Sequence, residues 1–102
     1  MSQHFFLKLI PQRTTFAQDM TAEERAIMLE HVAYWTGLMH QGIAVVFGPV
    51  MDPAGVYGVG IVQTENEEHL RSLMENDPAK TINRYEFWPM RAVRANLKPQ
   101  NE

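Results

Sequence analysis

The run Ile43–Phe47 (IAVVF) is apolar at every position and limits how this chain can fold. It opens the stretch Ile43–Met51, which the turn sequence Asp52–Gly55 (DPAG) separates from a second β-like stretch, Val56–Gln63. We predict two strands joined by a hairpin, because proline fixes φ and glycine accepts the positive φ of a tight turn. A sheet with one face in water alternates apolar and polar residues, and this run does not. Both faces of the sheet are therefore expected to be covered.

A long helix is expected before the hairpin, from Met20 to Gln41. Thr21 and Glu24 form a capping box, in which each side chain accepts a hydrogen bond from the other residue's backbone N–H. Gly42 is expected to end the helix in a left-handed conformation. The apolar stripe of this helix, read at helical spacing, also contains one histidine: Ile27, Met28, His31, Val32, Trp35, Leu38 and Met39.

A second helix is expected after the hairpin. Thr64 and Glu67 match a second capping box. The face of this helix carries Leu70, Leu73 and Met74. We expect it to stop at Asn76–Pro78, because a proline disfavours helical geometry in the residue before it.

Two outer segments complete the pattern: a strand His4–Ile10, stopped by Pro11, and a last strand Thr81–Val93. Residues 11–19 are read as a polar connection. The order βαββαβ, with right-handed crossovers, predicts an α+β ferredoxin-like plait with both helices on one face of an antiparallel sheet. We expect residues 1–95 to form a single domain and residues 96–102 to form a flexible C-terminal tail.

The face of the sheet away from the helices needs a cover that the rest of the chain does not supply. A second copy could supply it, sheet against sheet, to form a homodimeric α/β barrel, and such dimers could assemble further. The alternative is a monomer that tolerates a small apolar face, although monomers rarely expose such patches.

Composition restricts the possible partners and chemistry. The 102 residues carry a net charge of −3, which argues against nucleic acid or an anionic membrane as a partner. The absence of cysteine excludes disulfides and thiolate chemistry, and with no evident signal peptide or membrane span we expect a cytoplasmic protein. No cofactor motif occurs, and no metal site is expected, because His31 and His40 project about 180° apart around a helix.

His31 and Asp77 are the first candidates for a functional site. An imidazole in an apolar stripe needs a hydrogen-bond partner or a cleft, although a histidine satisfied by a nearby carbonyl is the more common case. Asp77 ends a helix, where the dipole disfavours a carboxylate, so another requirement could hold it there. An Asp-Pro helix stop explains it equally well. Sequence spacing leaves open whether the two side chains meet.

Gly48 and Pro49 are further candidates, since a glycine within a strand often marks the close approach of a ligand or backbone. Simple room for a packed helix is an equally good explanation. Gly58 and Gly60 share one face of the next strand and would leave a groove. Several aromatic residues could line an apolar substrate pocket or, more commonly, form core and dimer contacts: Trp35, Phe47, Tyr57, Tyr85, Phe87 and Trp88.

Four short motifs in a fixed order resemble the YciI-like, or YCII-related, family. They are Glu30-His31 with Tyr34 and Trp35, then Gly48-Pro49, Asp77-Pro78 and Trp88-Pro89, over about residues 4–93. The resemblance implies a dimeric α/β barrel related to muconolactone isomerase, with a site built on a histidine and an aspartate, here His31 and Asp77. One branch of the family contains dehydrochlorinases of chlorinated hydroxyquinols.

These observations lead to two hypotheses about function. The first is a cofactor-independent lyase or isomerase that transfers a proton on a small cyclic or aromatic compound, with His31 as acid or base and Asp77 as the group that orients it. Trp35, Phe47, Gly48 and Pro49 would line its substrate pocket. The second is a non-catalytic module that binds a small molecule, or an accessory protein that acts through its dimer surface.

Overall fold

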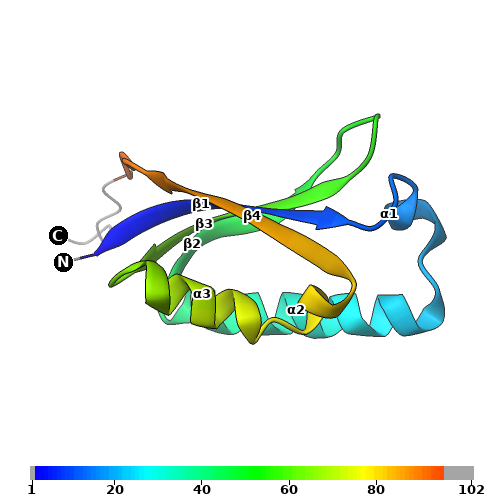
Figure 1. Ribbon diagram of the computed structural model, residues 1–102, viewed down its shortest axis with the longest axis horizontal. Coiled ribbons are helices and arrows are strands. Elements are labelled where there is room, and N and C mark those ends of the chain that lie inside the picture. The colour runs from blue at the N-terminus through cyan, green and yellow to red at the C-terminus, as the bar shows by residue number, and fades with distance from the viewer. Residues whose placement is uncertain (1, 96–102) are drawn as a thin grey trace, which may run out of the picture.

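The computed structural model describes residues 2–95 and shows one four-stranded antiparallel sheet with its two long helices on the same side (Figure 1). The strands lie in the order β2-β3-β1-β4. This order and the chain path give the expected α+β ferredoxin-like plait. The elements are β1 (Gln3–Pro11), α1 (Phe16–Asp19), α2 (Ala22–His40), β2 (Ala44–Val50), β3 (Tyr57–Thr64), α3 (Glu67–Glu75), the 3-10 turn η1 (Pro78–Thr81) and β4 (Asn83–Met90).

The inner face of the sheet packs against the helices and forms the core. On β1, Phe5, Leu7 and Leu9 point inward, and all three are buried. The register places Leu7 opposite Gly60 of β3. Gly60 in turn lies opposite Phe47 of β2. The core continues into the helices and neighbouring strands through Trp35, Leu38, Ala44, Val62, Leu70 and Met74.

The outer face of the sheet has no cover within residues 2–95 (Figure 1), and it carries exposed apolar side chains on β2 and β4 beside the charged pair of Lys8 and Glu86 on β1 and β4. Val46 is 56% exposed and Trp88 is 48% exposed. Phe6 contacts Trp88 across the β1–β4 pair, with the ring centroids 5.8 Å apart. As predicted, β2 does not alternate strictly between apolar and polar residues. Apolar side chains therefore lie on the solvent side of the sheet.

The two helix starts differ in how well the sequence predicted them. The capping box of Thr21 and Glu24 is confirmed, with both hydrogen bonds present. The second predicted box is wrong: Asn66 caps α3, and its side chain accepts a hydrogen bond from the backbone N–H of His69. Thr64 instead ends β3, buried, and donates to the carbonyl of Asn66. Glu67 is in the first turn of α3, where it pairs with Arg71.

Three further expectations need correction. The connection after β1 contains a short helix, α1, whose Phe16 is buried. The last strand is shorter than predicted, because residues 78–81 form η1 and pairing ends at Met90. The apolar stripe of α2 is buried only in part, since Val32 is 49% exposed and Met39 is 41% exposed. The predicted tail, residues 96–102, lies outside the described residues. Of the helices within residues 2–95, none has both the length and the apolar character of a membrane span.

Candidate functional site

His31 and Asp77 lie within hydrogen-bond distance, although 46 residues separate them in sequence. His31 projects from the middle of α2 toward the sheet, and Asp77 lies between α3 and η1. The Nδ1 atom of His31 is 3.0 Å from Oδ1 and 2.9 Å from Oδ2 of Asp77. The question that sequence spacing left open is therefore answered by the packing of η1 against α2.

Asp77 accepts hydrogen bonds from four residues while its side chain is fully buried. Besides His31, the donors are Nε1 of Trp35 at 3.0 Å, the hydroxyl of Tyr85 and the backbone N–H of Ala79 at 2.9 Å. Burial raises the pKa of Asp77, but the hydrogen bonds from His31, Tyr85, Trp35 and Ala79 outweigh it, so the net shift lowers the pKa. Asp77 is therefore a carboxylate at neutral pH and can only accept.

The local position of Asp77 differs from the expected one. α3 ends at Glu75, and Asp77 is the N-terminal cap of η1 rather than the last residue of a helix. Its carboxylate therefore accepts from the first free N–H group of the next turn, which is a favourable position. Pro78 begins η1, as is common at the first position of a helical turn. The argument from an unfavourable helix dipole was wrong.

Tyr85 is a partner of Asp77 that the sequence did not reveal. It lies on the inner face of β4, opposite Leu9, and its hydroxyl donates to Asp77 and accepts from Nε1 of Trp35 at 3.2 Å. Burial and the charge of Asp77 raise the pKa of Tyr85 far above its usual value, so the phenol stays protonated. Tyr34 is a second phenol near this carboxylate, and burial together with the charge of Asp77 raises its pKa. The sequence signal was the alternation along β4, which places Asn83, Tyr85 and Phe87 on one face.

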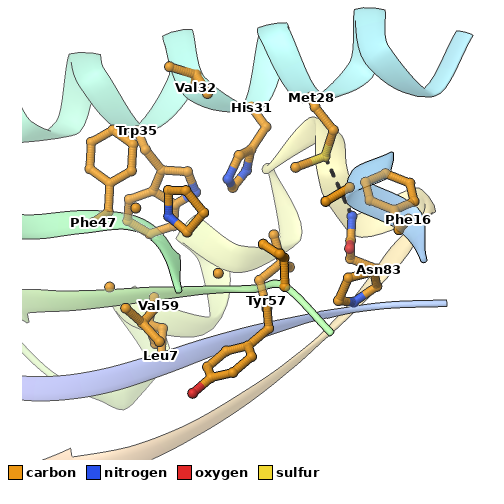
Figure 2. A pocket seen from close by; sticks show the side chains of 18 of the residues that line it. Leu7, Phe16, Met28, His31, Val32, Trp35, Phe47, Tyr57, Val59 and Asn83 are labelled. Carbon is orange, nitrogen blue, oxygen red and sulfur yellow. Dashed lines mark hydrogen bonds between the residues drawn. The ribbon is translucent and has the colours of Figure 1, made fainter. Parts of the chain in front are cut away.

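An apolar cavity of about 330 Å³ lies between α2 and the sheet, and His31 projects into it (Figure 2). Its walls come from α2, the inner face of β1 and β3, and the end of β2. Val32 and Met51 line the cavity and are exposed to solvent, so they mark its mouth. α1 closes one side through Phe16. A cavity of this size and lining is suited to a small, mainly apolar compound.

The four predicted pocket residues all line this cavity: Trp35, Phe47, Gly48 and Pro49. Trp35 and Phe47 contact each other, with ring centroids 6.5 Å apart. Gly48 has no atoms near the position where a side chain would begin, so a tight approach does not explain it. Among the other aromatic candidates, Tyr57 and Tyr85 also line the cavity, whereas Phe87 packs against the core and Trp88 lies on the outer face.

Gly58 and Gly60 contribute space to the cavity. Both belong to β3 and face α2, opposite Leu9 and Leu7. A side chain on Gly58 would begin 3.3 Å from the Cβ of Leu9, and one on Gly60 would begin 3.5 Å from the Cβ of Phe47. Larger residues at these positions would therefore fill the floor of the cavity. The two glycines thus leave the groove that the sequence predicted.

A model of the YCII-related domain family matches residues 5–92, which is most of the chain. The chain belongs to the YCII-related domain family. This confirms the resemblance that the four sequence motifs indicated. No curated protein matches the chain.

Solved structures share the fold of this YCII-related domain. The 5-chloro-2-hydroxyhydroquinone dehydrochlorinase of Burkholderia phenoliruptrix, in complex with 2,5-dihydroxybenzoquinone, is 19% identical, with a TM-score of 0.58 over 89% of this chain and 95% of the other. A protein of unknown function from Nitrosomonas europaea is 10% identical, with a TM-score of 0.50 over 96% and 98% of the two chains. At sequence identities this low, the similarity shows a shared fold and nothing more.

The bond to Asp77 determines which nitrogen of His31 faces the cavity of this YCII-related domain. Because the carboxylate only accepts, Nδ1 carries a proton, and in the neutral imidazole Nε2 is then the basic nitrogen. Within residues 2–95, Nε2 has no protein hydrogen-bond partner. The same part of the chain contains no group of three His, Asp or Glu side chains that could hold a metal ion. Because Nε2 of His31 is basic and has no partner among these residues, it can accept a proton from a compound bound in the cavity.

Proposed function

We propose that this protein is a cofactor-independent enzyme in which His31 transfers a proton on a small cyclic or aromatic compound. The observation that supports this proposal most strongly is the anchoring of Nδ1 by Asp77, 2.9 Å away, on an imidazole that projects into an apolar cavity. A base for proton transfer needs a defined tautomer and a position within reach of the substrate. Asp77 supplies the first requirement, and α2 supplies the second.

Asp77 acts as a positioning residue in this proposal. When Nε2 takes a proton from the substrate, His31 becomes an imidazolium, and the buried carboxylate beside it balances the new charge. Tyr85 and Trp35 hold the carboxylate in place through Oδ2. Since these donors are already oriented before the reaction, little reorganisation is needed when the charge forms.

The structural relative suggests the first compounds to test. The Burkholderia enzyme is named for the removal of hydrogen chloride from 5-chloro-2-hydroxyhydroquinone. In such an elimination a base takes a proton from the compound, the electrons of the broken bond to hydrogen form a new π bond, and chloride leaves with the electrons of the C–Cl bond. His31 is the group in the present cavity that can take that proton.

The test measures proton transfer by His31 directly. Substituted hydroquinones, including 5-chloro-2-hydroxyhydroquinone, are incubated with the protein, and chloride release and exchange of ring hydrogens with deuterated solvent are followed. We expect turnover by the native chain and a loss of about a hundredfold or more in His31→Gln, the usual range for a lost general base.

His40→Gln is the matched control, since it removes an exposed histidine from the end of the same helix. It should keep full activity. Equal activity in His31→Gln and the native chain would contradict the proposal. Tight binding of these compounds without exchange or chloride release would support the non-catalytic binding module instead.

We also infer that the outer face of the sheet pairs with a second copy of the chain. Val46, Trp88 and Met90 are all exposed on this face, and exposed apolar side chains gathered on one face often mark an interface. A homodimer related by a twofold axis would bury this face against itself and complete an α/β barrel. The cavity lies on the opposite side of the sheet, so pairing would support its floor without filling it.

A further inference from the structure

The cavity contains very few polar groups that are free to contact a ligand. Of the residues described, none of those that line it is Lys, Arg, Asp or Glu. Among its polar side chains, the hydroxyl of Tyr85 is already bonded to Asp77, and the ring of Tyr57 turns away from α2 (Figure 2). Two side chains remain with an unused polar atom: His31, through Nε2, and Asn83.

Asn83 begins β4 on the inner face of the sheet, next but one to Tyr85, and is 9% exposed. Its Nδ2 donates to the carbonyl of Ala79 at 3.0 Å and lies 3.7 Å from the sulfur of Met28 (Figure 2). Both partners are acceptors, so they fix which end of the amide is the nitrogen. Within residues 2–95, the amide oxygen has no hydrogen-bond donor. A ligand hydroxyl could supply one.

We propose that Asn83 is a ligand-recognising residue, and that Asn83 and His31 together select an uncharged ring compound with two hydroxyl groups. One hydroxyl donates to Oδ1 of Asn83, and the other donates to Nε2 of His31. The apolar walls contact the faces of the ring. This inference shares one assumption with the proposed function, namely that a small compound binds in this cavity.

The charges around the cavity select against anionic ligands. The cation of Arg13 stacks on Phe16 of the wall but is paired with Asp19 and Glu24. The cation of Lys8 lies over Tyr57, on the outer side of the sheet. A carboxylate or phosphate would therefore lose its hydration without gaining a cation. Protonation of His31 would not attract it strongly, since Asp77 already balances that charge.

The charge selection is tested with phenol and benzoate, two rings of similar size, at neutral pH. Binding is followed by calorimetry, and by tryptophan fluorescence in Trp88→Phe, in which Trp35 of the cavity wall is the remaining tryptophan. We expect phenol to bind at least about tenfold more tightly than benzoate, because the benzoate anion finds no cation in the cavity. Equal or tighter binding of benzoate would overturn the proposal.

The role of Asn83 is tested by comparing phenol with the three dihydroxybenzenes in the native chain and in Asn83→Leu, a variant of similar shape. In the native chain, the best dihydroxybenzene should bind roughly two- to tenfold more tightly than phenol, the value of one neutral hydrogen bond. In Asn83→Leu this ratio should fall to about one. A variant that merely loosens the fold would weaken all four compounds together and leave the ratio unchanged, which would overturn the proposal.

Failure of this inference can be told apart from failure of the proposed function. Binding with the expected ratios but no turnover would contradict the enzyme and leave Asn83 as a recognition residue. Efficient turnover of a compound that carries a carboxylate would support the enzyme and contradict the selection for uncharged rings. Failure of all four hydroxylated compounds to bind at their solubility limits would overturn the inference.

Discussion

Asp77 shows how a single residue can combine a local and a long-range role. Locally, it caps η1 through the backbone N–H of Ala79. At long range, it joins α2 to β4, because His31, Trp35 and Tyr85 all donate to it. A buried carboxylate is stable only when such donors replace the water it has lost. The four donors therefore explain why an acid is tolerated at a fully buried position.

Replacing Asp77 by asparagine should destabilise the chain at neutral pH by about 2–4 kcal/mol, because an amide cannot accept on both sides and leaves buried donors unpaired. The pKa of Asp77 is lower in the folded chain than in the unfolded chain. Its contribution to stability is therefore complete above about pH 4 and is lost as the pH falls through the lowered folded value. Urea unfolding between pH 7 and pH 2 should show a smaller loss of stability on acidification in Asp77→Asn than in the native chain.

The variant should keep some acid sensitivity. The hydrogen bond from Arg13 lowers the pKa of Glu24 to about 2, so Glu24 contributes in the same direction in both proteins. Parallel pH profiles for Asp77→Asn and the native chain would show that the carboxylate of Asp77 is not stabilised by folding.

At the scale of elements, the start of α3 is a place where a sequence pattern and the observed structure disagree. Thr64 and Glu67 have the spacing of a capping box, yet Thr64 belongs to β3 and Asn66 provides the cap. The sheet determines this outcome, because extending β3 to Thr64 pairs it with Gln3 and buries its side chain. A residue held in a strand cannot at the same time cap the next helix.

Substitutions at the start of α3 distinguish the two cap assignments. Asn66→Ala should lower the free energy of unfolding by about 1 kcal/mol, since the N–H of His69 loses its acceptor. Glu67→Gln should cost no more than about 0.5 kcal/mol, because it removes only an exposed pair with Arg71. Chemical denaturation of both variants measures these differences. A larger cost for Glu67→Gln than for Asn66→Ala would restore the capping box expected from the sequence.

At the scale of the whole molecule, the two faces of the sheet differ in what covers them. The inner face is covered by α2 and α3 and contains the cavity, whereas the outer face is open in the single chain (Figure 1). The exposed residues of β2 and β4 would be buried by a second copy. The proposed pairing and the proposed ligand binding would therefore use opposite sides of one sheet.

A charge on the outer face should prevent pairing without harming the chain. We expect the native protein to sediment as a dimer, and Val46→Glu to raise the dimer dissociation constant on the order of a hundredfold or more, because a twofold interface would bury the charge twice. Leu29→Glu, at a position of α2 that is 67% exposed, is the matched control and should remain a dimer. Sedimentation velocity over a range of concentrations measures both. A native monomer at high micromolar concentration would contradict the pairing.

The sequence by itself determined the order of the four strands and the two long helices, the plait and the family, because these depend on local signals. Apolar periodicity, the cap at Thr21 and the turn at Asp52–Gly55 each act over a few residues. The η1 turn was missed, since a 3-10 turn has no apolar period of its own. The cap of α3 was assigned incorrectly, since pairing of β3 decided it.

Only the tertiary structure decided which residues meet. His31, Asp77 and Tyr85 lie on three different segments, and the bond from Nδ1 to Asp77 forms because η1 packs against α2. The direction of the Asn83 amide depends in the same way on Ala79 and Met28. Contacts between distant segments depend on how helices and sheet pack in three dimensions, and sequence spacing carries no measure of that distance.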